Sequence, residues 1–164
     1  RKNHTVVLKA IAQMKAEPIY EKLCYVVCGR GIMDADLKRL AKDLGVDDKV
    51  RFLGYRQDIA EICNASDLFM FMSFQEGLPV ALMEAMATEL TCVAAKNRGT
   101  DDLLEESRLR FKATDVDDLK DKLRMAMSGD CSEEVSRNKA HLQQFDLSNT
   151  LEAVKMLYYT EIHI

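Results

Sequence analysis

The sequence predicts an α/β fold: a doubly wound, Rossmann-like parallel sheet with helices on both faces and a helical C-terminal end. Short apolar runs alternate at least four times with segments of helical periodicity, and this alternation is typical of βαβ units with right-handed crossovers. The apolar runs are continuous, as in strands that are covered on both faces. Beyond residue 115 the periodicity is helical only. Domains of this kind bind ligands at the carboxyl ends of their strands.

The expected elements alternate along the first two thirds of the chain. Strands are expected at residues 22–29, 49–54, 67–73, 91–95 and, at the edge of the sheet, 109–112. Helices are expected at residues 3–15, 34–45, 56–65 and 78–88, with a turn or short helix at 101–107.

The ends of these elements carry recognisable signals. Asn3 is a candidate N-cap, because apolar residues recur at helical spacing directly behind it. The run 22–29 stops at a glycine, and the amphipathic segment 34–45 ends at Gly45, a residue that commonly terminates helices. Pro79 lies in the first turn of the helix expected at 78–88, where proline is tolerated.

Three more helices are expected after residue 115. The apolar stripes that predict them are Val116, Leu119, Leu123 and Met127; then Val135, Leu142 and Phe145; then Leu151, Val154, Tyr158 and Ile162. Asp115 and Ser148 are candidate caps, and the first of these helices is expected to end near Gly129.

Composition excludes several classes of protein. The net charge of -4 and the pI of about 5.4 argue against a nucleic-acid partner, which requires a basic surface. No apolar run approaches the roughly 20 residues of a transmembrane segment. The five cysteines form neither a Cys-x-x-Cys pair nor a Cys/His cluster. They are expected to be reduced thiols, mostly buried, in a cytoplasmic protein.

The stretch 73–87, SFQEGLPVALMEAMA, places two carboxylates around a Gly-Leu-Pro turn. It follows the strand expected at 67–73, so its loop lies at the carboxyl end of a strand and presents backbone amides at a helix N-terminus, a favourable place for an anion. Gly77 allows a ligand to approach the backbone closely. Glu84 is a charge within an otherwise apolar helical segment.

The two carboxylates allow two other interpretations. Glu84 and Thr88 lie four residues apart and could form the solvated stripe of an ordinary helix, with Glu76 as a loop charge. A hydrolytic acid–base pair is disfavoured, because residues eight apart on a helix lie roughly 12 Å apart, whereas glycosidase carboxylates lie about 5 to 9.5 Å apart. A longer ligand that is rich in hydroxyl groups, such as a nucleotide-sugar, fits the separation better.

The stretch resembles the E-x7-E segment of family 4 retaining glycosyltransferases of the GT-B fold. The likeness continues in order through RKNH at the start, residues 25–73 and AAKNRGTDDLL at 94–104. It is similar in kind to the bacterial enzymes that build capsular, exopolysaccharide or lipopolysaccharide chains. Glu89, Thr91 and Thr100 depart from the family pattern, which affects the local geometry of their loops.

The resemblance implies roles for nine residues. Glu76, the catalytic-site residue, would lie against the donor sugar, and Glu84 would accept hydrogen bonds from the ribose hydroxyls. The remaining donor-binding residues would be Lys2 at the diphosphate, the amides of Gly77 and Leu78 at sugar or phosphate oxygens, Gly29 and Gly31 along the nucleotide, and Tyr55 and Arg56 near the base.

The same resemblance implies that residues 1–164 are the nucleotide-sugar-binding domain, a fragment of a larger two-domain enzyme. The family has an arginine several residues before the lysine, so this arginine and the strand that carries it are expected upstream of Arg1. The full-length protein would be a hexosyltransferase-type enzyme that needs no metal or other cofactor, and the isolated chain would be inactive.

The implied substrates are a UDP- or GDP-sugar donor and a glycan or lipid-linked acceptor held by the missing N-terminal domain. The implied location is the cytoplasm, with peripheral attachment to the inner membrane face left open for the full-length protein. Two alternatives also stay open. One is half of a GT-B sugar-nucleotide 2-epimerase, and the other is a non-catalytic Rossmann-like binding module.

Overall fold

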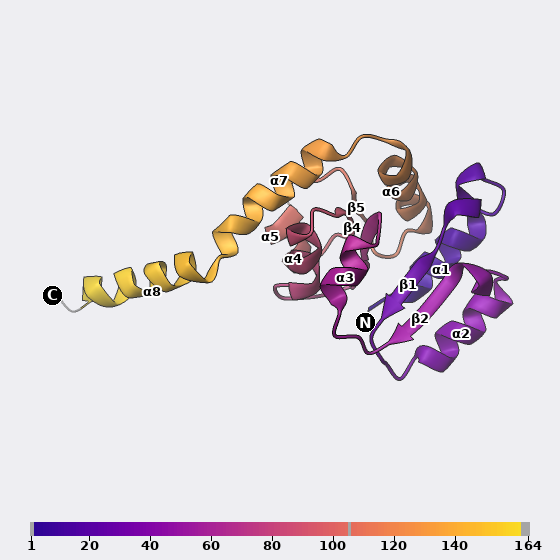
Figure 1. The fold of residues 1–164 in the computed structure, drawn as a ribbon, viewed down its shortest axis with the longest axis horizontal. Coiled ribbons are helices and arrows are strands. Elements are labelled where there is room, and N and C mark those ends of the chain that lie inside the picture. The colour runs from indigo at the N-terminus through magenta and orange to yellow at the C-terminus, as the bar shows by residue number, and fades with distance from the viewer. Residues whose placement is uncertain (1, 105, 162–164) are drawn as a thin grey trace.

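The computed structural model describes residues 2–104 and 106–161 and shows the alternating α/β order (Figure 1). The elements in order are α1 (His4–Gln13), the 3₁₀ helix η1 (Pro18–Lys22), β1 (Tyr25–Cys28), α2 (Asp34–Asp43), η2 (Asp47–Lys49), β2 (Val50–Gly54), α3 (Ile59–Asn64), β3 (Leu68–Phe71), α4 (Val80–Ala87), β4 (Thr91–Ala95), α5 (Arg98–Leu104), β5 (Arg110–Phe111), α6 (Val116–Ser128), α7 (Ser132–Leu142), η3 (Gln143–Phe145) and α8 (Leu147–Glu161). The predicted α/β class and helical C-terminal end are confirmed.

All of the strand pairs described are parallel, but they form two sheets rather than one. β1 pairs with β2, and β3, β4 and β5 form a second sheet in that order. The standard doubly wound order is 3-2-1-4-5-6. Among the described residues no strand pairing joins the two sheets, so the single continuous sheet that the sequence predicts is not seen.

The central strand β4 is covered on both of its faces, as the continuous apolar runs predict. Val93 and Ala95 face one hydrophobic cluster, whereas the alternate residues Cys92 and Ala94 face another. All four side chains are buried. Since successive side chains of a strand point to opposite faces, helices lie on both sides of this sheet.

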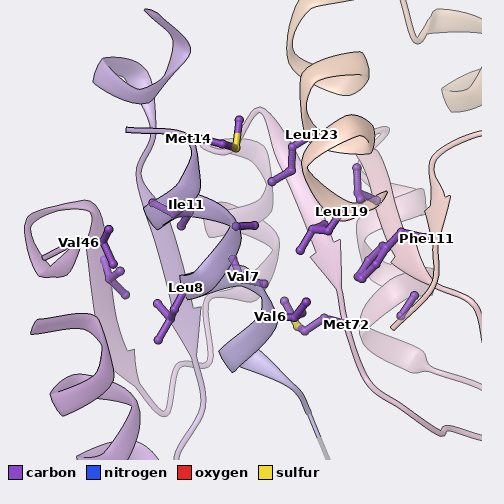
Figure 2. Close-up of a cluster of buried hydrophobic side chains, with 14 of the residues drawn as sticks. Val6, Val7, Leu8, Ile11, Met14, Val46, Met72, Phe111, Leu119 and Leu123 are labelled. Carbon is purple, nitrogen blue, oxygen red and sulfur yellow. The ribbon is translucent and has the colours of Figure 1, made fainter. Parts of the chain in front are cut away.

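The larger cluster joins the two sheets through α1 (Figure 2). Val7, Leu8 and Ile11 of α1 are buried against partly buried residues of β1 and β2, and also against α6. On the other side the same cluster contains Phe111 of β5. Burial of such side chains stabilises a fold by about 1.5–3 kcal/mol each, so α1 is the element that holds the halves of the domain together.

The smaller cluster supports the loop between β3 and α4. It contains Leu82 and Met86 of α4, Leu103 and Leu104 of α5, and Phe71 at the end of β3. Leu82 and Met86 are almost completely buried. The packing of these side chains therefore holds the start of α4 in place.

Two of the three predicted caps act differently in the structure. Asn3 does precede α1, but its side-chain Nδ2 donates to the carbonyl oxygen of Ala113, 2.7 Å away, and no side-chain cap bond forms. Ser148 lies inside α8, and its amide donates to Asp146 Oδ1 at 2.8 Å, so Asp146 holds this end. The prediction for Ser148 was therefore wrong by two residues. A tertiary contact and a local Asx turn replace the expected caps.

The last helix, α8, projects away from the rest of the domain (Figure 1). Leu147, Leu151 and Val154 are exposed along it. Ile162, the last residue of the predicted stripe, lies outside the described residues. Within the described part of the chain no helix is long and apolar enough to cross a membrane.

The predicted cap Asp115 provides a test of this architecture. Its carboxylate oxygen Oδ1 accepts hydrogen bonds from the amides of Asp117 at 3.1 Å and Asp118 at 3.0 Å, at the start of α6. We expect Asp115→Ala to lower the free energy of unfolding by about 1 kcal/mol, because two helix amides lose their acceptor. Urea unfolding followed by circular dichroism measures this. Asp115→Asn keeps an acceptor and should lose less. Equal losses in both variants would contradict a capping role.

Candidate functional site

The loop between β3 and α4 forms the centre of the candidate site. It begins at the buried Ser73 and ends at the buried Pro79, which directly precedes α4. Between these fixed ends Gly77 and Leu78 are exposed, and a Cβ placed on Gly77 would have no atom within 4 Å. The loop therefore presents open backbone at the carboxyl end of β3 and the N-terminus of α4, as predicted.

Glu76 and Lys2 meet directly. Lys2 Nζ donates to Glu76 Oε1 at 2.7 Å, and the Lys2 ammonium also lies 5.9 Å from the centre of the Phe71 ring. The Glu76 side chain is 15% exposed and that of Lys2 is 62% exposed. The ammonium end of this pair is therefore open to solvent, whereas the carboxylate end is largely covered.

Glu84 lies on the exposed side of α4, near α3. Its carboxylate is one of the groups that act on Cys63 of α3. Burial is the largest cause that raises the pKa of the Cys63 thiol, a hydrogen bond with Thr88 opposes it, and the charge of Glu84 adds to the rise. The charge in the apolar helix therefore faces the side of the domain where the chain passes from β2 into α3. The prediction that it lies on an open edge of α4 agrees with its exposure.

The two predicted glycines follow β1. Gly29 has φ of +119°, a conformation that residues with a side chain rarely adopt. Its amide donates to the carbonyl oxygen of Gly54 at 2.7 Å, which ties the end of β1 to the end of β2. The amide of Gly31 donates to Asp34 Oδ1 at 3.0 Å, where α2 begins. The Asp-Ala-Asp sequence at 34–36 therefore starts a helix.

Tyr55 and Arg56 follow β2 and are both exposed. Arg56 Nε donates to Asp58 Oδ1 at 2.8 Å, and a second guanidinium nitrogen pairs with the other carboxylate oxygen. These hydrogen bonds hold the pKa of Asp58 below its ordinary value. The ion pair orients Arg56, while the Tyr55 ring is 68% exposed and is available to a planar ligand.

The turn between β4 and α5 contacts the loop but was assigned no role from the sequence. Asn97 Nδ2 donates to the Ser73 carbonyl oxygen at 2.9 Å. Gly99 is buried against the Gly77 carbonyl group. The buried Thr100, where the family pattern has another residue, donates from Oγ1 to the Ala95 carbonyl oxygen at 2.7 Å. The sequence signal that could have identified this contact is Gly99, a glycine between polar residues shortly after a buried strand.

The nine predicted residues occupy two adjacent regions at the carboxyl ends of the strands. Lys2, Glu76, Gly77 and Leu78 form the first region, beside β3, with Glu84 on α4 behind them. The second region, at the ends of β1 and β2, consists of Gly29, Gly31, Tyr55 and Arg56. In the described residues no group of three or more His, Cys, Asp and Glu side chains could hold a metal ion, and independence from metals stays a prediction.

Comparison of the sequence with family models and known proteins gives a consistent result. Residues 1–143 match the family model described as glycosyl transferases group 1. A UDP-Gal:α-D-GlcNAc-diphosphoundecaprenol α-1,3-galactosyltransferase of Escherichia coli is 30% identical over 82% of this chain. An undecaprenol-linked α-1,4-N-acetyl-D-galactosaminyltransferase of Campylobacter jejuni is 28% identical over 92% of it. The chain spans 36% and 43% of these two relatives.

Solved structures share the fold of the chain. Anabaena HepE in complex with UDP and glucose covers 96% of this chain with a TM-score of 0.81 and 23% identity, and the match spans 45% of HepE. TarM of S. aureus covers 96% with a TM-score of 0.84 and 18% identity, over 33% of its own length. At these identities the likeness concerns the fold, which is the GT-B fold that was expected.

The histidine beside Lys2 predicts a dependence of stability on pH. His4 Nδ1 lies 2.7 Å from the hydroxyl oxygen of Tyr25. Burial, and then the charge of Lys2, lowers the pKa of His4 from its ordinary 6.5. The unfolded chain therefore takes up this proton first, so His4 stabilises the fold fully above pH 6.5 and less as the pH falls toward the lowered pKa.

Urea unfolding between pH 7.5 and pH 5.5 tests this. We expect the free energy of unfolding to fall across this window in the natural chain and to fall less in His4→Gln, which has no proton to gain. His141→Gln is the control, because that ring is partly exposed. Equal slopes in the natural chain and in His4→Gln would contradict the assignment to His4.

Proposed function

Because the chain belongs to the group 1 glycosyltransferase family, we propose that it is the donor-binding domain of a retaining glycosyltransferase. The full-length protein transfers a hexose-type sugar from a nucleotide-diphosphate sugar to a lipid-linked or glycan acceptor in the synthesis of a bacterial surface polysaccharide. The observation that carries the proposal is the loop 73–79, in which open backbone amides lie between the Lys2–Glu76 pair and Glu84.

In this proposal the two carboxylates bind the two ends of the donor. Glu84 accepts hydrogen bonds from the ribose hydroxyls, since an ionised carboxylate is purely an acceptor. Glu76 accepts from hydroxyls of the donor sugar. The amides of Gly77 and Leu78, at the N-terminus of α4, donate to the oxygens between them, where negative charge is favoured.

Lys2 exchanges partners when the donor binds. The Lys2–Glu76 pair keeps both charges in place in the free chain. The diphosphate then takes over Lys2, and Glu76 accepts hydrogen bonds from hydroxyls of the sugar. When the sugar–phosphate bond breaks, charge accumulates on the diphosphate, and the Lys2 ammonium with the loop amides stabilises it. This transfer needs no metal ion in the proposal.

The ends of β1 and β2 hold the nucleoside. Gly29 and Gly31 let the nucleotide lie against the backbone, and Tyr55 and Arg56 lie beside the base. UDP is the nucleotide we favour over GDP, because the name of the E. coli relative specifies UDP-galactose and HepE was crystallised with UDP.

The names of two relatives support a proposal for the acceptor. Both act on undecaprenol-linked sugars by name, so we propose a lipid-linked or glycan acceptor held by the part of the enzyme outside this chain. We accordingly propose action in the cytoplasm, with peripheral contact at the inner membrane face. The isolated chain is then expected to bind the donor nucleotide without transferring its sugar.

Glu84→Gln tests the ribose contact. We expect UDP to shift amide resonances of residues 76–84 in the natural chain, and we expect Glu84→Gln to weaken UDP binding by roughly tenfold, because a hydrogen bond to a charged group contributes about 1.5–3 kcal/mol. Two-dimensional NMR titration with UDP and with GDP measures this. Glu133→Gln, an exposed carboxylate on α7, is the matched control.

Two results of this titration would contradict the proposed function. Absence of shifts at residues 76–84 with millimolar UDP and GDP, in a chain that is folded by circular dichroism, would refute donor binding. Binding that Glu84→Gln leaves unchanged would instead favour a non-catalytic module whose glutamates are merely solvated.

Lys2→Ala tests whether Lys2 binds the diphosphate rather than the nucleoside. We expect this variant to bind UDP roughly tenfold more weakly and uridine as well as the natural chain does, because only the phosphate contact is lost. The difference should shrink as the salt concentration rises, since Lys2 is exposed. Lys15→Ala, an exposed lysine behind α1, is the control. Equal losses for UDP and uridine would contradict the role of Lys2.

A further inference from the structure

Of the described glycines, Gly99 packs most tightly against the backbone of the candidate site. A Cβ placed on Gly99 would lie 1.9 Å from the carbonyl oxygen of Gly77, 2.9 Å from its carbonyl carbon and 3.0 Å from Pro79 Cδ. Real Cβ atoms essentially never come closer than 3.0 Å to another heavy atom. Since the obstructing atoms belong to backbone and a proline ring, no flexible side chain can move aside.

This contact fixes the direction of the peptide group between Gly77 and Leu78. No described peptide bond is cis, and in a trans peptide the C=O and N–H groups point in opposite directions. Because the Gly77 carbonyl points at Gly99, the Leu78 amide points away from α5. A Cβ placed on the neighbouring Gly77 would have no atom within 4 Å. Within the described chain no hydrogen-bond acceptor for the Leu78 amide is found.

The start of α5, which contains Gly99, is itself held by hydrogen bonds to Asn97. The Asn97 amide donates to Thr100 Oγ1 at 3.0 Å, and the Thr100 amide donates to Asn97 Oδ1 at 3.2 Å. The Asn97 side chain also donates to the carbonyl oxygen of Ser73, the first residue of the loop 73–79. The loop is therefore held at Ser73 by a hydrogen bond and at Gly77 by packing.

We propose that Gly99 is a positioning residue for the donor. Its missing side chain lets the Gly77 carbonyl pack onto α5, and this aims the Leu78 N–H at an anionic oxygen of the donor diphosphate. The inference rests on the proposed function. Gly99 itself contacts no ligand, so its effect is confined to binding that uses the diphosphate.

Gly99→Ala tests the proposal by displacing the Gly77–Leu78 peptide. We expect UDP binding to weaken at least tenfold, measured by NMR titration or calorimetry, while uridine binding stays unchanged because the Glu84 contact persists. Gly129→Ala is the matched control. A Cβ there would lie 2.8 Å from the Met125 carbonyl oxygen at the end of α6, so it also meets backbone, less closely than at Gly99, and it lies outside the candidate site.

The results distinguish a failure of this proposal from a failure of the proposed function. If Gly99→Ala binds UDP as tightly as the natural chain does, the proposal is wrong. It is equally wrong if uridine and UDP weaken by the same factor, because the damage is then general. If the natural chain itself binds neither UDP nor GDP, the proposed function fails instead.

A second measurement requires no variant, and therefore holds even if Gly99→Ala does not fold. In the natural chain we expect the Leu78 amide proton to shift downfield on addition of UDP, as a proton that donates to phosphate does, and not on addition of uridine. A Leu78 amide that responds equally to both ligands, or to neither while other loop residues respond to UDP, would overturn the proposal.

Discussion

The direction of the strands is the constraint on which the candidate site depends. In each described pair the strands run parallel, so their carboxyl ends meet at one edge and the loops that follow them converge there. In the first sheet this places Gly29 beside Gly54 at the end of β2, and in the second it places the loop that starts at Ser73 beside Asn97, which follows β4. The α1 helix belongs to the buried cluster that contains residues of both sheets, so the stability of that core and the geometry of the site are linked.

Within this frame, charge is distributed to suit a long anionic ligand. Lys2 and Glu76 compensate each other in the free chain, whereas the backbone of Gly77 and Leu78 offers donors that are held by packing rather than by charge. Fixed dipoles of this kind need no reorganisation when negative charge develops. The proposed binding mode therefore combines a solvent-exposed cation with backbone amides of the loop, and the contribution of the cation depends more on salt.

Much of this could be predicted from the sequence, because the strands and helices are encoded by local periodicity and by Gly and Pro signals. The charge of Glu84 in an apolar segment pointed to α4 and the loop before it, and their role in binding stays a prediction. The rest depends on tertiary contacts that no local pattern contains. Asn3 looked like a cap but bonds Ala113, and the contact of Gly99 with Gly77 joins two turns whose proximity follows only from the pairing of β3 with β4. The division of the sheet was also not foreseen, since periodicity does not reveal which strands pair.

The central claim is that the two carboxylates and the loop between them bind one nucleotide diphosphate. A crystal structure of the chain with UDP tests it most directly. The account predicts the ribose within hydrogen-bond distance of Glu84, the diphosphate against the Leu78 amide, and Lys2 moved from Glu76 to a phosphate oxygen. Clear density for UDP at another surface, with the Lys2–Glu76 pair intact and the loop empty, would contradict it.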